Sequence, residues 1–252
     1  MTATRLRAPV ALAVPSGLAG LTVLLQVAYP LLHGPARTTL TIVTVVLFFG
    51  ASTTHALLTR GATWTVAFVA LTAGTGLVAE AAGVRTGLPF GRYAYSDSLG
   101  LQLADVPLVV PLAWAMFAYP SLLVGQRLAR GAVGATLLGA WGLASWDLFL
   151  DPQMVAAGHW HWSSVTHHLP GVDHVPVSNF VGWALVSLAM MGALQGLPRR
   201  GTDDRVPHAL FLWTYASSVL ANAVFFGRPG VALVGGTVMG LVALPFAMSL
   251  RE

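Results

Sequence analysis

Trp146-Asp147-Leu148-Phe149-Leu150-Asp151-Pro152 ends an apolar run that starts near Gly131. The stretch places two carboxylates inside a segment that is otherwise apolar. Asp147 and Asp151 are four residues apart, and this spacing puts both side chains on one face of a helix. Ionisable groups at membrane depth are rare and mark a functional site by default. The stretch therefore predicts a membrane helix that carries a carboxyl pair.

The composition is that of a polytopic membrane protein. Of 252 residues, 56% are apolar and 9% are charged, against roughly 25% charged in ordinary soluble domains. The mean hydropathy is +0.72. All 13 basic residues are Arg and lie between apolar runs, a distribution that argues against nucleic-acid binding. The chain has no Cys, which excludes disulfides, thiol catalysis and Cys-ligated metals.

A membrane-spanning helix needs about 20 mostly apolar residues. Eight segments qualify: 9–32, 38–58, 63–84, 105–125, 131–151, 176–196, 206–226 and 231–250. We predict an all-α transmembrane bundle of about eight spans, with seven as the alternative because segments 105–125 and 231–250 contain internal Pro. Residues 1–252 are expected to form one integral-membrane domain. The apolar run after Arg5 and Arg7 is expected to be a retained first span and not a cleaved signal peptide.

The Arg positions predict the orientation, because cytoplasmic loops carry an excess of basic residues. With the N-terminus inside, the cytoplasmic residues are Arg5, Arg7, Arg60, Arg127, Arg130, Arg199, Arg200, Arg205 and Arg251. The outward residues are Arg37, Arg85, Arg92 and Arg228. We therefore expect both termini in the cytoplasm of a bacterial cell and the chain in the cell membrane. The two longest connections, 85–104 and 152–175, then share the opposite face.

Several polar and aromatic residues are expected to converge at that opposite face. They are Glu80, Asp105, Asp147, Asp151, Asn179, Trp183 and Asn222. In the seventh predicted span, Tyr215, Ser218 and Asn222 follow the i, i+3, i+7 spacing of one helix stripe. This stripe is a candidate lining of the same cavity.

The carboxyl pair has two interpretations. Asp147 and Asp151 are either helix-end residues exposed to lipid headgroups, with Pro152 ending the helix, or a pair in an apolar pocket. In a pocket, desolvation and mutual repulsion would keep one of them protonated near neutral pH, as a general acid requires.

The other acidic residues are more ambiguous. Glu80 lies one turn from a loop and either pairs with Arg85 or Arg92 or joins the site. Asp105 is expected to be a helix N-cap. The Asp203-Asp204 pair, in a short cytoplasmic loop, is expected to be solvated.

The connection after the fifth predicted span is rich in His and Trp. Its histidines are His159, His161, His167, His168 and His174. No HxxxH, HxxHH or HExxH motif occurs, so no metal is expected, and an interfacial belt of His and Trp is the simpler interpretation. The belt alone would explain most of the tryptophans Trp146, Trp160, Trp162 and Trp183, but a belt does not preclude a pocket in which they present π faces to a cation.

Four groups of short motifs lie between Glu80 and Trp183. They are Pro89-Phe90-Gly91-Arg92-Tyr93-Ala94-Tyr95; Val106-Pro107 with Val110-Pro111-Leu112-Ala113-Trp114; Asp147-Leu148-Phe149-Leu150-Asp151-Pro152-Gln153-Met154-Val155 with Gly158, Trp160 and Trp162; and Val175-Pro176 with Asn179-Phe180 and Gly182-Trp183. Together they resemble the integral-membrane carotenoid biosynthesis proteins, a family that includes carotenoid 1,2-hydratases and bisanhydrobacterioruberin hydratase. The His-rich stretch 163–174 departs from the family pattern.

The resemblance implies hydration of a terminal isoprenoid double bond of an acyclic or monocyclic carotenoid to a tertiary alcohol. Asp147 or Asp151 would protonate the alkene and aromatic faces would stabilise the cation; water held by the partner carboxylate, with Glu80 or Asn179 as further candidates, would then add. No cofactor is required. The expected partners are the carotenoid in the bilayer, membrane lipids and other enzymes of the pathway. The expected substrate-binding residues are Trp146, Trp160, Trp162, Asn179, Trp183, Tyr93, Tyr95, Trp114, Tyr215 and Asn222.

Two other functions compete with hydration. Asp147-x-x-x-Asp151 has the spacing with which intramembrane prenyltransferases hold magnesium and a diphosphate, but that chemistry needs a second acidic motif to complete the coordination shell. Asp203-Asp204 is too short for that role and lies at the wrong face. A non-catalytic carotenoid- or lipid-binding membrane protein is the remaining alternative, and it predicts that both aspartates tolerate Asn.

Overall fold

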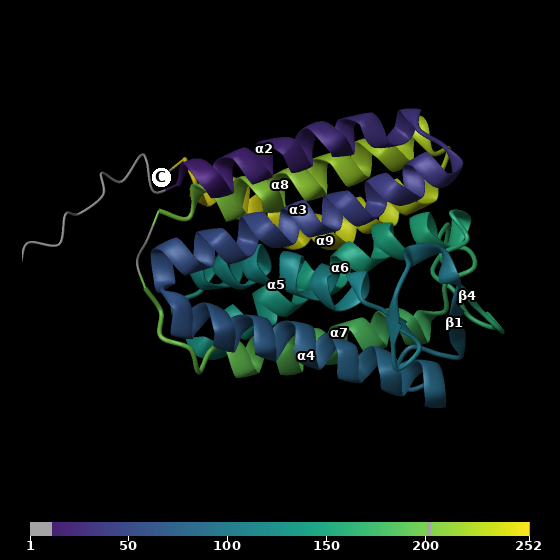
Figure 1. Cartoon of the computed structure of the whole chain (residues 1–252), viewed down its shortest axis with the longest axis horizontal. Coiled ribbons are helices and arrows are strands. Elements are labelled where there is room, and N and C mark those ends of the chain that lie inside the picture. The colour runs from purple at the N-terminus through teal and green to yellow at the C-terminus, as the bar shows by residue number, and fades with distance from the viewer. Residues whose placement is uncertain (1–11, 201–202, 252) are drawn as a thin grey trace, which may run out of the picture.

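The computed structural model describes residues 12–200 and 203–251, and its helices run side by side in an elongated bundle (Figure 1). Arg5, Arg7 and the first residues of the predicted span 9–32 lie outside the described residues. The helices are α2 (Ala13–Ala28), α3 (Gly34–Arg60), α4 (Ala62–Thr86), α5 (Val109–Leu128), α6 (Ala132–Ala156), α7 (Val177–Leu194), α8 (Arg205–Leu220) and α9 (Pro229–Ser249). Short 3₁₀ turns η1 (Tyr29–Leu31) and η2 (Asp97–Leu99) interrupt the connections.

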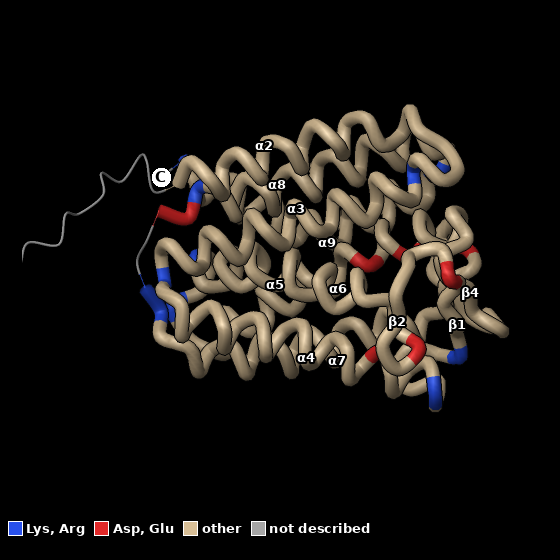
Figure 2. Tube along the Cα trace, in the orientation of Figure 1, with Lys and Arg blue, Asp and Glu red and all other residues tan. Residues whose placement is uncertain are grey.

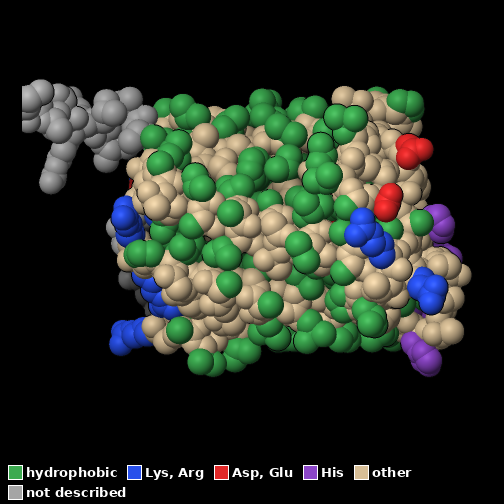
Figure 3. Space-filling view, turned by 60° about the horizontal axis from the view of Figure 1, so that its bottom comes forward, with side chains coloured by type: hydrophobic (Ala, Val, Ile, Leu, Met, Phe, Trp, Pro, Cys, Tyr) green, Lys and Arg blue, Asp and Glu red, His purple; other side chains and the backbone are tan. Residues whose placement is uncertain are grey.

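Seven of the described helices are long and apolar enough to cross a membrane. The remaining one, α8, has 16 residues and continues directly into the five-residue π-helix η3 (Ala221–Phe225). Together α8 and η3 cover all but the last residue of the predicted span 206–226. Figure 3 shows hydrophobic side chains over the middle of the surface and charged and His side chains toward its two ends. The predicted all-α bundle is confirmed, and the chain is a multi-pass membrane protein.

Helices α5 and α6 form the centre of the bundle. Helix α5 packs against α3, α4, α6 and α8, and its Trp114, Phe117 and Tyr119 are fully buried. Helix α4 approaches Trp114 closely because Gly76 has no side chain: a Cβ at that position would lie 2.8 Å from the indole ring. The close packing of α4 on α5 fixes the Trp114 ring beside the space described below.

The two ends of the bundle differ in charge. Figure 2 shows most acidic positions at the end that carries strands β1 (Tyr93–Tyr95) and β2 (Gln102–Leu103), and most basic positions at the other end. Helix α2 begins and α9 ends at the basic end (Figure 1). The first described helix begins and the last one ends at the same end because an even number of described helices runs between the two ends.

The fourth predicted span begins later than expected. Strand β2 pairs with β3 (Val106–Pro107), and the two residues between them, Ala104 and Asp105, both have positive φ, 55° and 65°. Positive φ at both central residues is typical of a tight hairpin turn. Helix α5 therefore starts at Val109 after N-cap Leu108, and the prediction that Asp105 caps this helix is wrong.

The fifth predicted span extends further than expected. Helix α6 continues through Pro152 to Ala156, although Pro removes one backbone hydrogen bond from a helix interior. Packing of α6 against α5, α7 and α9 keeps the helix intact beyond Pro152. Asp147 and Asp151 are therefore internal residues, 1% and 3% exposed, and the headgroup-exposed interpretation of the pair is wrong.

The two long connections pair with each other through antiparallel strands. Strand β1 lies beside β4 (Trp160–Trp162), with Tyr93 opposite Trp162 and Tyr95 opposite Trp160. Side chains alternate across a strand, so these four aromatic residues share one face, while Ala94 and His161, which are exposed, share the other. The aromatic face closes over the acidic end of the bundle.

Candidate active site

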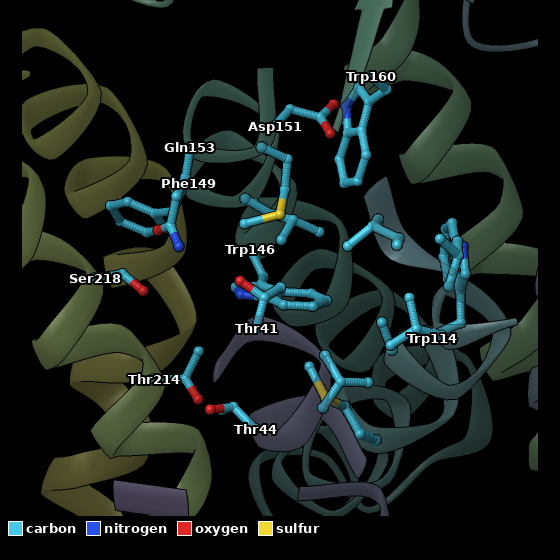
Figure 4. Close-up of a pocket in the computed structure, with 18 of the residues that line it drawn as sticks. Thr41, Thr44, Trp114, Trp146, Phe149, Asp151, Gln153, Trp160, Thr214 and Ser218 are labelled. Atoms are coloured by element: carbon cyan, nitrogen blue, oxygen red, sulfur yellow. The ribbon is translucent and has the colours of Figure 1, made fainter. Parts of the chain in front are cut away.

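A cavity of about 170 Å³ opens beneath the β1–β4 pair, between helices α3, α4, α5, α6, α7 and α8. Ten of the thirteen predicted site residues line it: Glu80, Tyr93, Tyr95, Trp114, Trp146, Asp151, Trp160, Trp162, Asn179 and Trp183. Figure 4 shows the Asp151 carboxyl beside the Trp160 indole at one end of this space. Residues from spans and loops far apart in the sequence thus share one pocket.

Asn179 joins the two aspartates. Its Nδ2 donates to Asp147 Oδ2 at 2.8 Å and also to Asp151 Oδ2. Asn179 lies in the first turn of α7 and is 2% exposed. Asp151 lines the cavity, whereas Asp147 lies behind it, and Asp147 Oδ1 has no hydrogen-bond partner within the described residues. The side-chain amide of Asn179 on α7 therefore binds one carboxyl oxygen from each of the two aspartates on α6.

Glu80 is held by three neutral donors. Tyr95 OH donates to Oε2 at 2.8 Å, Tyr93 OH donates to the same oxygen, and Trp114 Nε1 donates to Oε1 at 2.9 Å. Burial, followed by the negative charge of Glu80, raises the pKa of both phenols well above its ordinary value, so both hydroxyls keep the protons they donate. Glu80 consequently faces the cavity as a hydrogen-bond acceptor.

No cation neutralises these acidic groups. Over residues 12–200 and 203–251, the ion pairs are Arg60–Asp204, His168–Asp173 and Arg205–Asp203, and none involves Glu80, Asp147 or Asp151. The interpretation in which Glu80 pairs with Arg85 or Arg92 is therefore wrong. The cavity has acidic groups, aromatic walls and no positive side chain in its lining.

The aromatic wall has a defined geometry. The Trp114 and Trp183 rings stack at 3.8 Å with 15° between their planes, and Trp146 meets Trp183 edge to face at 6.1 Å. Tyr93 lies next to Gly83, where an added Cβ would come within 2.8 Å of the Tyr93 hydroxyl oxygen. The rings therefore sit around the cavity beside the acidic groups and not in an open interfacial belt.

The predicted stripe on the seventh span faces the cavity only in part. Ser218 lines it, together with Thr214, Ser217 and Ala221. Tyr215 and Asn222 do not: Tyr215 OH donates to Gly236 O at 3.1 Å, and Asn222 Nδ2 donates to Ser218 O at 2.9 Å. The lining stripe is offset from the predicted one because the spacing identifies a face but not which partner helix that face meets.

The basic end of the bundle contains a separate ion-pair network. Arg60 is 3% exposed, and its guanidinium bonds Asp204 at 2.8 Å and the hydroxyl of Tyr119 at 2.5 Å. Arg205 holds Asp203 and lowers the pKa of that carboxyl to about 2. The expectation that Asp204 is solvated is therefore wrong, since its side chain pairs with Arg60 and is 17% exposed.

The loop histidines point in different directions. His161, His167, His168 and His174 are exposed, and His159 is buried with Nδ1 against Ser98 Oγ at 2.8 Å. Burial lowers the pKa of His159, which favours the neutral ring. Among the described residues, no group of three or more His, Asp or Glu side chains is placed to hold a metal ion.

Several cavity residues were not anticipated from the sequence. They are Gln26, Tyr29, Thr41, Thr44, Gln153, Thr214 and Ser217. Thr and Ser are common in membrane helices, where their hydroxyls often bond their own helix, so nothing in the sequence distinguishes those that face a cavity. Gln153 is close to Asp151 in the sequence, and Thr214 and Ser217 are close to Ser218. This closeness is the signal that could have identified these three residues.

The fold and the site define a multi-pass membrane protein with an acidic, aromatic-walled cavity between its helices. Residues 40–248 match the family described as carotenoid biosynthesis protein. The chain belongs to this family.

A curated relative is named bisanhydrobacterioruberin hydratase, from Haloarcula japonica. The two chains are 32% identical over 188 residues, which are 68% of this chain and 61% of the relative. The match therefore spans about three fifths of the relative's length. No solved structure matches the chain.

Proposed function

We propose that this protein is a carotenoid hydratase of the cell membrane, which adds water to a terminal isoprenoid C=C bond to give a tertiary alcohol. The observation that carries this proposal is the Asp147–Asn179–Asp151 cluster, which opens through Asp151 onto an aromatic cavity. The named activity of the Haloarcula relative supports it. The small cavity suits one end of a long carotenoid, with the rest of the chain remaining in the bilayer.

Proton transfer begins the reaction. Two carboxyl groups sharing one amide donor in a dry pocket repel each other when both are ionised, so the pair holds one proton. Asp151 donates that proton because it faces the cavity, and Asp147 and Asn179 position it. The O–H bond of Asp151 breaks as a C–H bond forms at the less substituted alkene carbon, which leaves a tertiary carbocation.

The walls then stabilise the cation. The tryptophan rings that line the cavity, which include the stacked Trp114 and Trp183, the perpendicular Trp146, and Trp160 and Trp162 of β4, present π density to it. A desolvated cation–π contact contributes about 2 kcal/mol or more. Glu80 adds carboxyl oxygens whose three donors are all neutral, so when this carboxyl is ionised the nearest positive charge is the substrate cation itself. Preorganised charge of this kind acts strongly in a water-excluded site.

Water completes the reaction. A C–O bond forms between water and the tertiary carbon, and the oxonium proton passes to the carboxylate of the Asp147–Asp151 pair. The pair regains the proton that it donated, and the net change is alkene plus water to alcohol. No redox step enters this balance.

The prenyltransferase alternative is disfavoured by the placement of the acids. Asp203 and Asp204 lie at the basic end and are occupied by Arg205 and Arg60, so they cannot complete a metal site with Asp151. Chelation separates the alternatives: turnover should survive exhaustive treatment with a chelator, whereas a strict magnesium requirement would favour prenyl transfer.

Pigment analysis tests the proposal. The chain is expressed in a host that accumulates acyclic carotenoids, with the Asp151→Asn variant as the matched control, and the pigments are analysed by mass spectrometry. We expect pigments heavier by one or two waters only with the unmodified chain. Unchanged pigment masses in a host that contains membrane-inserted protein would refute the hydratase proposal.

A further inference from the structure

One wall of the cavity carries hydroxyl groups in place of aromatic rings. Its members are Thr41 and Thr44 from α3 and Thr214, Ser217 and Ser218 from α8. The proposed proton donor Asp151 and the carboxylate Glu80 reach the cavity from α6 and α4 instead. In the view of Figure 4, Asp151 and Thr44 lie at opposite ends of the space, with Trp146 between them. The hydroxyl wall is therefore distinct from the acidic cluster.

Thr44 is the unusual member of this wall. It is 8% exposed, and its Oγ1 has no hydrogen-bond partner among the described residues. The hydroxyls of Thr41 and Thr54, in the same helix, donate to the carbonyl four residues earlier, at 3.0 and 2.6 Å. Thr44 does not, although it lines the cavity, and in the view of Figure 4 its hydroxyl points toward the Thr214 hydroxyl from α8. An unpaired buried hydroxyl is unfavourable, so this one points to a ligand group.

The α8 side of the wall offers acceptors. Thr214 Oγ1 donates its proton to Leu210 O at 2.8 Å, and Ser217 Oγ contacts Thr214 O at 3.5 Å. A hydroxyl that donates to its own helix keeps lone pairs for a ligand. Thr44 supplies a donor and the α8 residues supply acceptors, and none of the five side chains is charged. This combination matches an uncharged group that both donates and accepts, which is a hydroxyl.

The depth of Thr44 limits where that hydroxyl comes from. Thr44 is ten residues beyond Gly34, the first residue of α3, which corresponds to about 15 Å along the helix. This places it near the middle of a hydrocarbon core of about 30 Å. A hydroxyl at this depth arrives either as water that enters the cavity or as part of the isoprenoid ligand.

We propose that Thr44, with Thr214, Ser217 and Ser218, binds one uncharged hydroxyl group, supplied by water or by the terpenoid ligand. The role of that group as reactant water or as a substrate handle rests on the proposed hydratase function. The existence of the site does not, because a hydroxyl-bearing ligand can be bound without turnover.

Ligand binding tests the site directly. The probes are tetrahydromyrcenol, a saturated branched tertiary alcohol, and its parent hydrocarbon dimethyloctane, and binding to purified protein is followed by fluorescence of the cavity tryptophans. One net hydrogen bond should make the alcohol bind roughly fivefold more tightly than the hydrocarbon. Thr44→Val keeps the side-chain shape, removes the hydroxyl and should bring this ratio close to one.

Two control variants isolate the cavity effect. Thr72→Val removes a buried hydroxyl that bonds Phe68 O at 2.8 Å, away from the cavity lining. Ser187→Ala removes a buried hydroxyl that, like Thr44, lacks a described partner but does not line the cavity. Both should keep the wild-type ratio. An unchanged ratio in Thr44→Val, or equal loss in all three variants, would overturn the proposal.

A turnover arm in heavy water identifies the source of the hydroxyl. If Thr44 holds the reactant water, Thr44→Val should form less alcohol while deuterium still enters the recovered alkene, because the unquenched cation loses a proton. If it holds a substrate hydroxyl, the variant should slow only a hydroxylated substrate and leave the ratio of deuteration to hydration unchanged. Absence of hydration by the wild-type protein would contradict the hydratase function alone, since the binding ratio decides the site.

Discussion

Asn179 is the residue that turns two separate acids into one group. A single amide nitrogen bonds an oxygen of Asp147 and an oxygen of Asp151, so the position of the donated proton depends on all three side chains. Asp151 lines the cavity and Asp147 does not, so in the proposed mechanism Asp147 acts through Asp151. Residues that act as a unit give strongly non-additive losses when they are replaced singly.

The first prediction concerns these aspartates. Asp151→Asn should lower hydration by roughly 10²–10⁴-fold, the usual loss when general acid catalysis is removed, and Asp147→Asn should lower it comparably. Both variants should remain folded, because Asn is similar in shape and less costly to bury than a charge. The measurement is alcohol formation per unit of membrane-inserted protein, with Asp105→Asn, at an exposed turn, as the control. Near-normal activity of both Asn variants would move the acid elsewhere, with Glu80 as the next candidate.

The second prediction concerns the aromatic lining. Trp160→Leu or Trp162→Leu should reduce turnover by roughly thirtyfold, which corresponds to a cation–π contribution of about 2 kcal/mol. Trp141→Leu provides a control, because Trp141 is 38% exposed, bonds Val238 O and lies outside the cavity lining. A tryptophan variant more damaging than either aspartate variant would reverse the assigned order of importance.

At the scale of elements, helix α4 shows how small residues position the site. Gly83 allows Phe90 and Tyr93 to lie against the helix, where an added Cβ would be 2.7 Å from the Phe90 ring and 2.8 Å from the Tyr93 hydroxyl. Tyr93 in turn donates to Glu80, which lies one turn before Gly83 on α4. The backbone at Gly83 therefore helps to set the position of the Glu80 carboxylate.

The third prediction compares two glycines of α4. Gly83→Ala should displace Tyr93 and reduce hydration, whereas Gly74→Ala, where an added Cβ meets nothing within 4 Å, should leave activity unchanged. Ala is favoured over Gly in a helix interior by up to about 1 kcal/mol, so Gly74→Ala should slightly raise the thermal midpoint in detergent. Equal activity of the two variants would show that Tyr93 does not need its present position.

The sequence predicted elements better than contacts. Hydropathy identified the spans, because each must be apolar over its full length, and the four-residue spacing identified the carboxyl face. The sequence did not predict that α6 runs through Pro152, because the continuation of this helix depends on packing against neighbouring helices. The pairing of β1 with β4 and of Arg60 with Asp204 was also missed, since residues far apart in the sequence, 144 positions in the case of the ion pair, leave no local pattern.

At the scale of the molecule, the charge asymmetry predicts the orientation in the membrane. The end with α2's first and α9's last residues is rich in Arg, and the other end carries the site (Figure 2). Cytoplasmic ends of membrane helices carry the basic excess. We therefore expect the site to open toward the outer half of the membrane.

The fourth prediction tests this orientation with reporter fusions. Fusions after Arg127 and after Arg200 should report a cytoplasmic location, because both positions follow helices that end at the basic end of the bundle. A fusion near Ser164, in the connection that contains β4, should report the outside. The opposite pattern would place the carboxyl cavity at the cytoplasmic face.

The uncompensated acidity of the cavity should also select among the lipids of a crowded membrane. Polyprenyl diphosphates share the branched tails of neutral polyenes but end in several negative charges, and like charges brought together in a dry space cost several kcal/mol. With Glu80 and Asp151 in the described lining and no Arg there, we expect such anions to be repelled, while uncharged hydrocarbon ends enter. Selectivity of this kind would arise from rejecting precursors with the same tail, and it would require no contact that recognises the length of the polyene.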